Sequence, residues 1–100
     1  MIISTFPSKN IIESKINDMI ITKKICACIS YFKIRSFYSW ENKIENHDEM
    51  MVLFKTTKTN SEKLKKEIKT IHPYEVPEII ELVASDVENT YMKWMIESMK

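Results

Sequence analysis

The chain of 100 residues contains no glycine. Glycine adopts positive φ angles without steric cost, so every tight turn in this protein must use another residue type. Asparagine tolerates that conformation better than most residues, which indicates Asn42, Asn46 and Asn60 as turn residues. The sequence also lacks an apolar run of the roughly 18 residues that a membrane-spanning helix needs. We therefore expect no membrane partner.

Cysteine is scarce and the charges nearly cancel. Cys26 and Cys28 are the two cysteines, and on a strand their side chains would point to opposite faces, which disfavours a disulfide. A thiol at Cys28 could bind a soft metal or respond to oxidation, but a small buried side chain is the commoner role of a free cysteine. The formal net charge of +1 gives no electrostatic basis for binding nucleic acid. The N-terminus lacks the basic start of a signal peptide, and we expect a cytoplasmic protein.

The apolar periodicity predicts one α+β domain over residues 1–100. The predicted strands are 1–6, 25–45, 50–54 and 78–83, and the predicted helices are 7–23, 59–71 and 89–99. This order of elements is that of a ferredoxin-like βαββαβ sandwich with an additional C-terminal helix.

Local signals predict the turns and the helix starts. The segment 46–48 (Asn-His-Asp) has the best composition for a hairpin turn. Ser8 and Asn89 are candidate N-caps, and Thr59 with Glu62 has the spacing of a capping box.

The least generic stretch is 72–78, with the sequence His-Pro-Tyr-Glu-Val-Pro-Glu. Its two prolines exclude a helix or a central strand and predict a stiff, extended connector. His72 beside Glu75 could ligate a divalent cation or transfer protons. The competing interpretation is a histidine fixed by a hydrogen bond to the backbone, because a metal site needs several ligands.

Five stretches resemble one known family. They are His72–Ile79 (HPYEVPEI), Trp40–Glu45 (WENKIE), Phe54–Thr57 (FKTT), Tyr91–Trp94 (YMKW) and the pair Ala27-Cys28. In this order and register they resemble the CutA family, called divalent-cation tolerance proteins. The resemblance implies the ferredoxin-like fold and assembly as a tight homotrimer.

The resemblance also implies a role for copper, with a qualification. Copper binding in bacterial members looks tied to a cysteine on the first strand and to two adjacent histidines before the proline. In this chain Ser4 and Ile71 stand at two of those positions, and only His72 remains. We therefore predict a weak site for copper or another divalent cation at His72 and Glu75.

Three functions are consistent with these residues. The first is a homotrimeric, CutA-like divalent-cation tolerance protein. The second is a trimeric small-molecule or signalling module similar in architecture to the PII regulators, with ligands at clefts between subunits. The third is a structural trimer without a ligand. No nucleophile–base pair or phosphate-binding loop stands out, so we do not expect an enzyme.

One departure from the family pattern concerns the long strand. Family members usually carry a Pro-Gly pair between the Ala-Cys and Trp-Glu motifs, whereas this chain has neither residue there and one residue fewer between Cys28 and Glu41. A Pro-Gly pair in a strand usually marks a bulge. We therefore predict that the bulge near Phe32-Lys33 is lost or tighter.

That loss has two expected consequences. Ile34, Tyr38 and Trp40 should keep the facing that directs them to the core. Lys33 or Arg35 should lie at the edge of a neighbouring cleft, which would favour an anion as its ligand.

Overall fold

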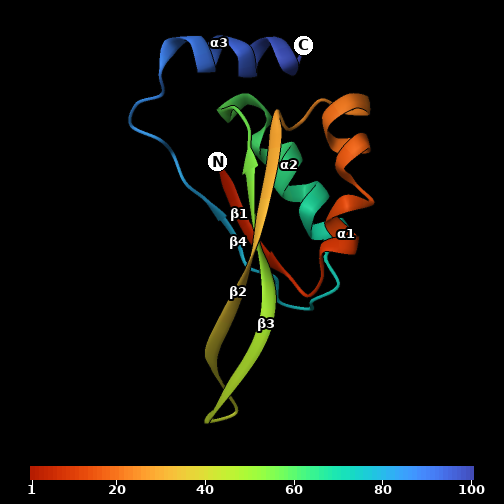
Figure 1. Ribbon diagram of the computed structural model, residues 1–100, viewed down its shortest axis with the longest axis vertical. Helices are drawn as coiled ribbons and strands as arrows, with labels where there is room; N and C mark the ends of the chain where they lie inside the picture. Colours follow the sequence, from red (N-terminus) through yellow and green to blue (C-terminus); the bar gives the residue numbers. More distant parts are fainter.

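A computed structural model describes residues 1–100 as an antiparallel sheet with the first two helices packed on one face and the C-terminal helix across one end (Figure 1). The elements are β1 (Ile2–Phe6), α1 (Lys9–Glu13), the π-helical turn η1 (Asp18–Thr22), β2 (Cys28–Trp40), β3 (Lys43–Lys55), α2 (Lys58–Ile71), β4 (Ile79–Glu81) and α3 (Asn89–Ser98). The strand order is β2-β3-β1-β4, with all pairs antiparallel. This is the predicted ferredoxin-like arrangement with an additional C-terminal helix.

The core lies between the sheet and the helices. Its cluster of buried residues comprises Ile2, Phe6, Ile12, Met19, Ile25, Cys26, Val52, Phe54, Leu64 and Ile68. Alternate residues of β1 and β3 supply the sheet side of this cluster, as expected for strands with one face covered. Leu64 and Ile68 are four residues apart on α2 and form its buried face, which confirms the predicted periodicity of that helix.

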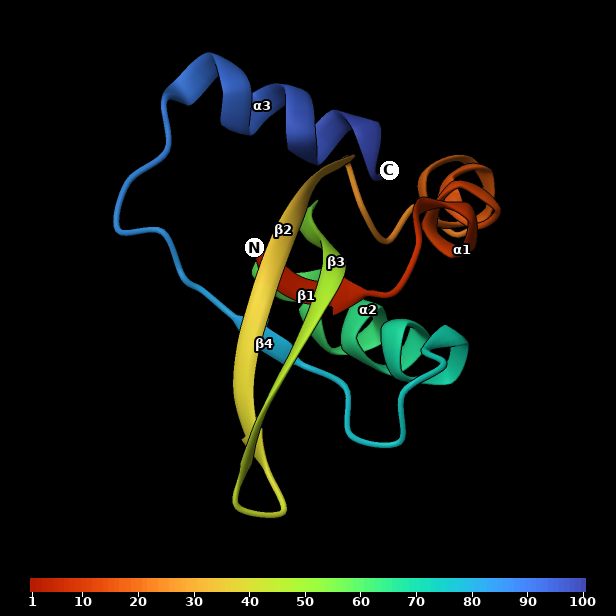
Figure 2. The ribbon, with the colours of Figure 1, turned by 60° about the horizontal axis from the view of Figure 1, so that its bottom comes forward.

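Strands β2 and β3 form a hairpin that extends past the rest of the sheet (Figures 1 and 2). Their register runs without interruption from the pair Cys28↔Lys55 to the pair Trp40↔Lys43, so the predicted loss of the bulge is confirmed. The last residue of β3 that pairs with β1 is Met50. Beyond it, residues 34–49 pair only with each other, and we call this part of the hairpin the arm.

The predicted position of the hairpin turn is wrong. The turn is formed by Glu41 and Asn42, at φ 52° and 62°. Two consecutive positive φ angles give a loop whose twist matches that of the flanking strands. Asn42 was expected to accept this conformation, but for Glu41 it is strained. Asn46 instead lies within β3, where its side chain accepts a hydrogen bond from Arg35 across the arm.

The prediction that Ile34, Tyr38 and Trp40 face the core is also wrong within one chain. Ile29 and Tyr31 of β2 pack against the core. Because side chains alternate along a strand, Ile34, Tyr38 and Trp40 lie on the other, helix-free face of the sheet. Trp40 is 58% exposed. The apolar alternation of the arm therefore marks a second face of the sheet and not the core beneath the helices.

The first helical segment, predicted over 7–23, is interrupted. Helix α1 ends at Glu13, and the chain then passes through a turn into η1. The hydroxyl of Ser14 donates to the carbonyl oxygen of Ile11 (2.7 Å), the kind of local bond that competes with helical hydrogen bonding. Ser8 is the N-cap residue, but its side chain makes no capping bond.

The other two predicted caps are wrong by one or two residues. Helix α2 starts after Thr57, without a side-chain cap, so Thr59 and Glu62 form no capping box. Helix α3 is capped by Glu88 and not by Asn89, because the Glu88 carboxylate accepts hydrogen bonds from two backbone amides of the first turn. The bonds that Glu88 accepts lower the pKa of its carboxyl group, the bond from the Thr90 hydroxyl most of all.

Helix α3 lies across the end of the sheet, away from the arm (Figure 2). Met95 is its buried residue. None of the helices combines the length and the hydrophobicity that crossing a membrane would require.

Candidate functional site

The extended segment 72–78, which we call the connector, joins α2 to β4. His72 ends α2 with an extended backbone (φ −74°, ψ 131°), as expected for a residue before proline. The connector then passes the base of the arm, where the Tyr74 hydroxyl donates to Oε2 of Glu49 (2.9 Å). This hydrogen bond joins residues that are 25 positions apart in the sequence.

His72 is held by the backbone on both sides of its ring. Its Nε2 lies 2.8 Å from the carbonyl oxygen of Thr5, which can only accept, and its Nδ1 accepts from the amide of Tyr74 (3.2 Å). These partners select the neutral ring protonated at Nε2. The ring also stacks on Phe6, with centroids 4.1 Å apart. Burial lowers the pKa of His72, because it disfavours the charged ring.

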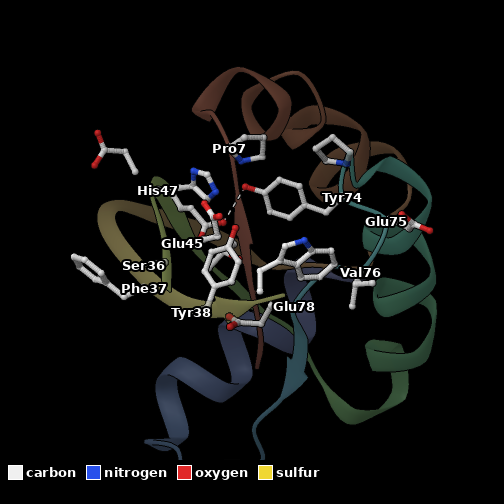
Figure 3. Close-up of a pocket in the computed structure, with 15 residues that line it drawn as sticks. Pro7, Ser36, Phe37, Tyr38, Glu45, His47, Tyr74, Glu75, Val76 and Glu78 are labelled. Carbon is white, nitrogen blue, oxygen red and sulfur yellow. Dashed lines mark hydrogen bonds between the residues drawn. The ribbon is translucent and has the colours of Figure 1, made fainter. Parts of the chain in front are cut away.

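The residues that sequence reasoning assigned to a metal are not brought together as a ligand set. Glu75 lines a cleft but is exposed and points outward (Figure 3), whereas His72 does not line that cleft. Ser4 is fully buried, and its hydroxyl donates to the Glu78 carbonyl (2.6 Å). No group of three or more His, Cys, Asp or Glu side chains is arranged to hold a metal ion. These residues therefore do not fit a preformed copper site within one chain.

The largest cavity lies between the arm and the connector and has a volume of about 1050 Å³ (Figure 3). Its lining residues are Thr5, Pro7, Ser36, Phe37, Tyr38, Trp40, Glu45, His47, Asp48, Glu49, Pro73, Tyr74, Glu75, Val76 and Glu78. We call this cavity the acidic cleft. It combines aromatic rings with carboxylates and contains no lysine or arginine.

The negative charge of the acidic cleft is largely uncompensated. Five carboxylates line it, and of these only Asp48 has basic partners, Arg35 at 3.0 Å and Lys33 at 3.9 Å. The hydrogen bond from Arg35 and the charge of Lys33 lower the pKa of Asp48. Neither basic residue lines the cleft, so the prediction that Lys33 or Arg35 would form its edge and favour anions is wrong.

The deepest carboxylate of the acidic cleft is Glu49, which is only 8% exposed. Its hydrogen-bond donor is Tyr74. Burial, and then the bond to Glu49, raise the pKa of the Tyr74 phenol to about 12. The pair thus keeps a proton on the phenol and a compact hydrogen bond at the base of the arm.

Sequence reasoning missed the contribution of the arm to this site. Glu45, His47 and Glu49 are two residues apart on β3 and therefore share one face of the strand. This alternation is visible in the sequence, but placing the hairpin turn at 46–48 hid it. With the turn at Glu41-Asn42, the same three residues would have been predicted to line one side of the arm.

The comparisons with known proteins agree on one family. The model of the CutA1 divalent ion tolerance protein matches residues 1–98. The chain belongs to this family. It is 38% identical to the divalent-cation tolerance protein CutA of Pyrococcus horikoshii, over 100% of this chain and 97% of the relative. The CutA of Thermotoga maritima is 36% identical, over 98% of this chain and 96% of the relative.

Solved structures of CutA1 proteins share the fold. The crystal structure of CutA1 from Pyrococcus horikoshii superposes with a TM-score of 0.89 at 39% identity, covering 100% of this chain and 99% of the other. The structure from Archaeoglobus fulgidus, described as a periplasmic divalent cation tolerance protein CutA, gives a TM-score of 0.91 at 29% identity over 99% and 96% of the two chains. The resemblance to the CutA family and the predicted fold are thus both confirmed.

Both cysteines of this CutA1 family chain are free. Cys26 is fully buried, and its thiol donates to the carbonyl oxygens of Cys28 (3.2 Å) and Lys55 (3.3 Å). Burial raises the pKa of the Cys26 thiol to about 12, which keeps it protonated and unreactive. Cys28 is half-buried, with its sulfur 3.8 Å from the Ser30 hydroxyl.

A second cavity of about 760 Å³ lies beneath α3. Its walls are mainly apolar side chains of α3 and of the segment 82–87, together with the start of α2. Its one side-chain carboxylate, Glu81, is already paired with Lys65 (2.8 Å). The acidic cleft is therefore the better candidate for a site that recognises charge.

Proposed function

We propose that this CutA1 family protein acts as a homotrimer in divalent-cation tolerance and that its acidic cleft attracts the cations. The observation that carries the proposal is the set of cleft carboxylates without basic partners: Glu45, Glu49, Glu75 and Glu78. Carboxylate oxygens are ligands for hard divalent cations, and an uncompensated acidic cavity raises the local concentration of any cation. The names of the relatives from Pyrococcus and Thermotoga support the same role.

The proposal includes copper as one of the cations. The hypothesis from the sequence places this ion at His72 and Glu75. For His72 to bind copper, it would have to give up its bond to Thr5 or to Tyr74. His47, the other histidine, lines the acidic cleft and is exposed. We therefore propose that His47 and the cleft carboxylates contribute more to cation binding than His72.

The homotrimer is supported by the surface of the arm. Phe32, Tyr38 and Trp40 lie on the helix-free face of the hairpin and are 51%, 41% and 58% exposed. Soluble monomers rarely leave so much contiguous apolar surface uncovered. In the proposed trimer each arm lies on a neighbouring subunit, and light scattering at micromolar protein concentration should give three times the chain mass. A mass equal to one chain would contradict the trimer.

Equilibrium dialysis of the assembled protein against Cu(II) and Zn(II) tests the cation site. We expect Glu45→Gln and His47→Ala to weaken binding, and His72→Ala to leave it nearly unchanged. Glu62→Gln is the matched control, because it removes one charge from an exposed part of α2. Loss of binding in His72→Ala would instead assign the ion to the sequence-predicted pair. Equal binding by every cleft variant and the control would contradict a role for the cleft.

The proposal also includes a cytoplasmic location and no catalytic activity. Both remain predictions from the sequence. Fractionation of the source cells, followed by detection of the protein with an antibody, would test the location.

A further inference from the structure

The charges of the chain are divided unevenly between its parts. The segments 7–24 and 58–71, which contain α1, η1 and α2, cover one face of the sheet, and we call them the helix layer (Figure 1). The helix layer contains nine lysines and four acidic residues, so its formal charge is +5. The rest of the chain contains six basic and ten acidic residues and carries −4. The net charge of +1 therefore conceals a strongly basic surface.

The carboxylates of the helix layer already have partners within the protein. Lys23 pairs with Asp18 (3.2 Å) and Glu67 (2.8 Å), and Lys65 pairs with Glu62 (2.6 Å). The fourth carboxylate accepts a hydrogen bond from a tyrosine hydroxyl of β2 (2.6 Å). The lysines of the layer that form no ion pair are Lys9, Lys15, Lys24, Lys58, Lys63, Lys66 and Lys69.

Three of these unpaired lysines lie on the outer side of α2. Lys63, Lys66 and Lys69 are exposed, and they lie on the side of the helix opposite to the buried Leu64 and Ile68. Residues three apart are neighbours on a helix surface, so the three ammonium groups repel one another. An anion that neutralises them would relieve this repulsion.

The composition of the helix layer indicates which kind of anion fits it. The layer contains no aromatic residue and no arginine, the side chains that stack on bases and bind phosphates through two hydrogen bonds. Its one large apolar side chain that is exposed is Ile21, whereas binding to a membrane surface needs a row of apolar side chains. Lysines on flexible stems suit the carboxylates of an acidic polypeptide, which can adapt to them.

We propose that the helix layer is a docking surface for an acidic segment of a partner polypeptide. The proposed homotrimer uses the helix-free face of the hairpin, and the helix layer covers the opposite face of the sheet, so assembly leaves the layer open (Figures 1 and 2). Each chain of the trimer would present one such surface. The docking surface needs neither the acidic cleft nor a metal ion.

Fluorescence anisotropy of a labelled oligo-glutamate peptide, titrated with the assembled protein, tests the proposal. EDTA is present throughout, so that a metal ion cannot bridge the peptide to the acidic cleft. We expect saturable binding at about 0.05 M NaCl and an affinity lower by about tenfold or more at about 0.5 M NaCl, because salt screens exposed charges. Unlabelled oligothymidylate and vesicles of phosphatidylcholine with phosphatidylserine serve as competitors that represent nucleic acid and membrane.

Two double variants separate the helix layer from the net charge. The first combines Lys63→Gln with Lys66→Gln and should weaken peptide binding by about fivefold, since each exposed charge pair contributes modestly. The second combines Lys43→Gln with Lys93→Gln, which removes the same charge from exposed positions outside the layer. We expect the second to change the affinity by less than about twofold.

Three results would overturn the proposal. They are the absence of saturable peptide binding at low salt, an equal loss of affinity in the two double variants, and tighter binding of oligothymidylate or the vesicles than of the peptide. Circular dichroism and light scattering must show that each variant keeps the wild-type fold and mass. If the Lys63 and Lys66 variant fails to fold, Lys69→Gln against Lys93→Gln makes the same comparison with one charge each.

Discussion

The hydrogen bond from Tyr74 to Glu49 should be a major contribution to the stability of the arm. It is the side-chain hydrogen bond between the connector and the arm, and its acceptor is buried. The substitution Tyr74→Phe removes only the hydroxyl. The ring that packs beside His72, with centroids 5.0 Å apart, is kept. The perturbation therefore leaves the packing in place and the Glu49 carboxylate without its donor.

Two considerations set the expected loss of free energy of unfolding in Tyr74→Phe. A hydrogen bond to a charged group contributes about 1.5–3 kcal/mol to the free energy of unfolding. Burial is the first cause of the raised Tyr74 pKa and the bond to Glu49 only the second, which places the contribution of the bond toward the lower end of this range. Tyr74 is only half-buried, so solvent screening reduces this contribution further. We expect Tyr74→Phe to lower the free energy of unfolding by about 1.5 kcal/mol, or the melting temperature by roughly 6–12 °C.

Urea denaturation followed by circular dichroism measures the effect. All proteins must be compared at the same concentration, because the stability of an oligomer depends on it. Tyr31→Phe is the matched control: the Tyr31 hydroxyl also donates to a carboxylate, Glu13, but at an exposed position (2.6 Å). We expect that control to change the free energy of unfolding very little.

A double-mutant cycle with Glu49→Gln separates the hydrogen bond from other effects of the substitution. If the bond to a buried carboxylate is the cause, Tyr74→Phe should cost about 1 kcal/mol less when residue 49 is already uncharged. Strictly additive effects, or equal losses in Tyr74→Phe and Tyr31→Phe, would show that the reasoning about Glu49 is incorrect.

Two further predictions concern the same part of the molecule. The folded-state pKa of Tyr74 is raised to about 12, so its stabilising effect should be complete below pH 10 and be lost as the pH rises through 12. The hydrogen bond to Glu13 also raises the pKa of Tyr31. Absorbance at 295 nm should therefore lose a titration step near pH 12 in Tyr74→Phe, and an unchanged late titration in that variant would contradict the assignment. Glu41 adopts a strained φ of 52° in the hairpin turn, and glycine adopts such an angle without steric cost. We therefore expect Glu41→Gly to raise the free energy of unfolding by about 1 kcal/mol, as measured by urea denaturation. A decrease would mean that the turn is unstrained.

The fold could be predicted from the sequence because its signals are local and repeated. The helical spacing of Leu64 and Ile68 and the two prolines of the connector each restrict the backbone directly. The order of the elements then leaves few arrangements, and the strand order agrees with the ferredoxin-like one. The absence of glycine made turns harder to locate, because Glu41 carries no signal for a positive φ angle.

The candidate site could not be predicted to the same degree because it depends on contacts across the chain. His72 was singled out for its chemistry, but the partners that occupy its nitrogens, Thr5 and Tyr74, are known only once the connector is placed against β1. Glu49 was not singled out from the sequence, because it lies just before the apolar strand predicted over 50–54. Its importance follows from burial against Tyr74, which no spacing in the sequence indicates.

The shape of the acidic cleft and the stability of the arm both depend on the hydrogen bond from Tyr74 to Glu49. The connector is stiffened by its prolines, so it presents the Tyr74 hydroxyl in a fixed position. The two strands of the arm, in contrast, form backbone pairs only with each other, because the pairing of β3 with β1 ends at Met50. A cation that binds to Glu49 would stabilise the carboxylate in the conformation that also accepts from Tyr74. By linkage, such binding favours the conformation in which the hydrogen bond from Tyr74 to Glu49 is formed. Tyr38 and Trp40 both line the cleft and lie on the face through which the arm is proposed to assemble, so assembly determines how much of the cleft stays open to a cation.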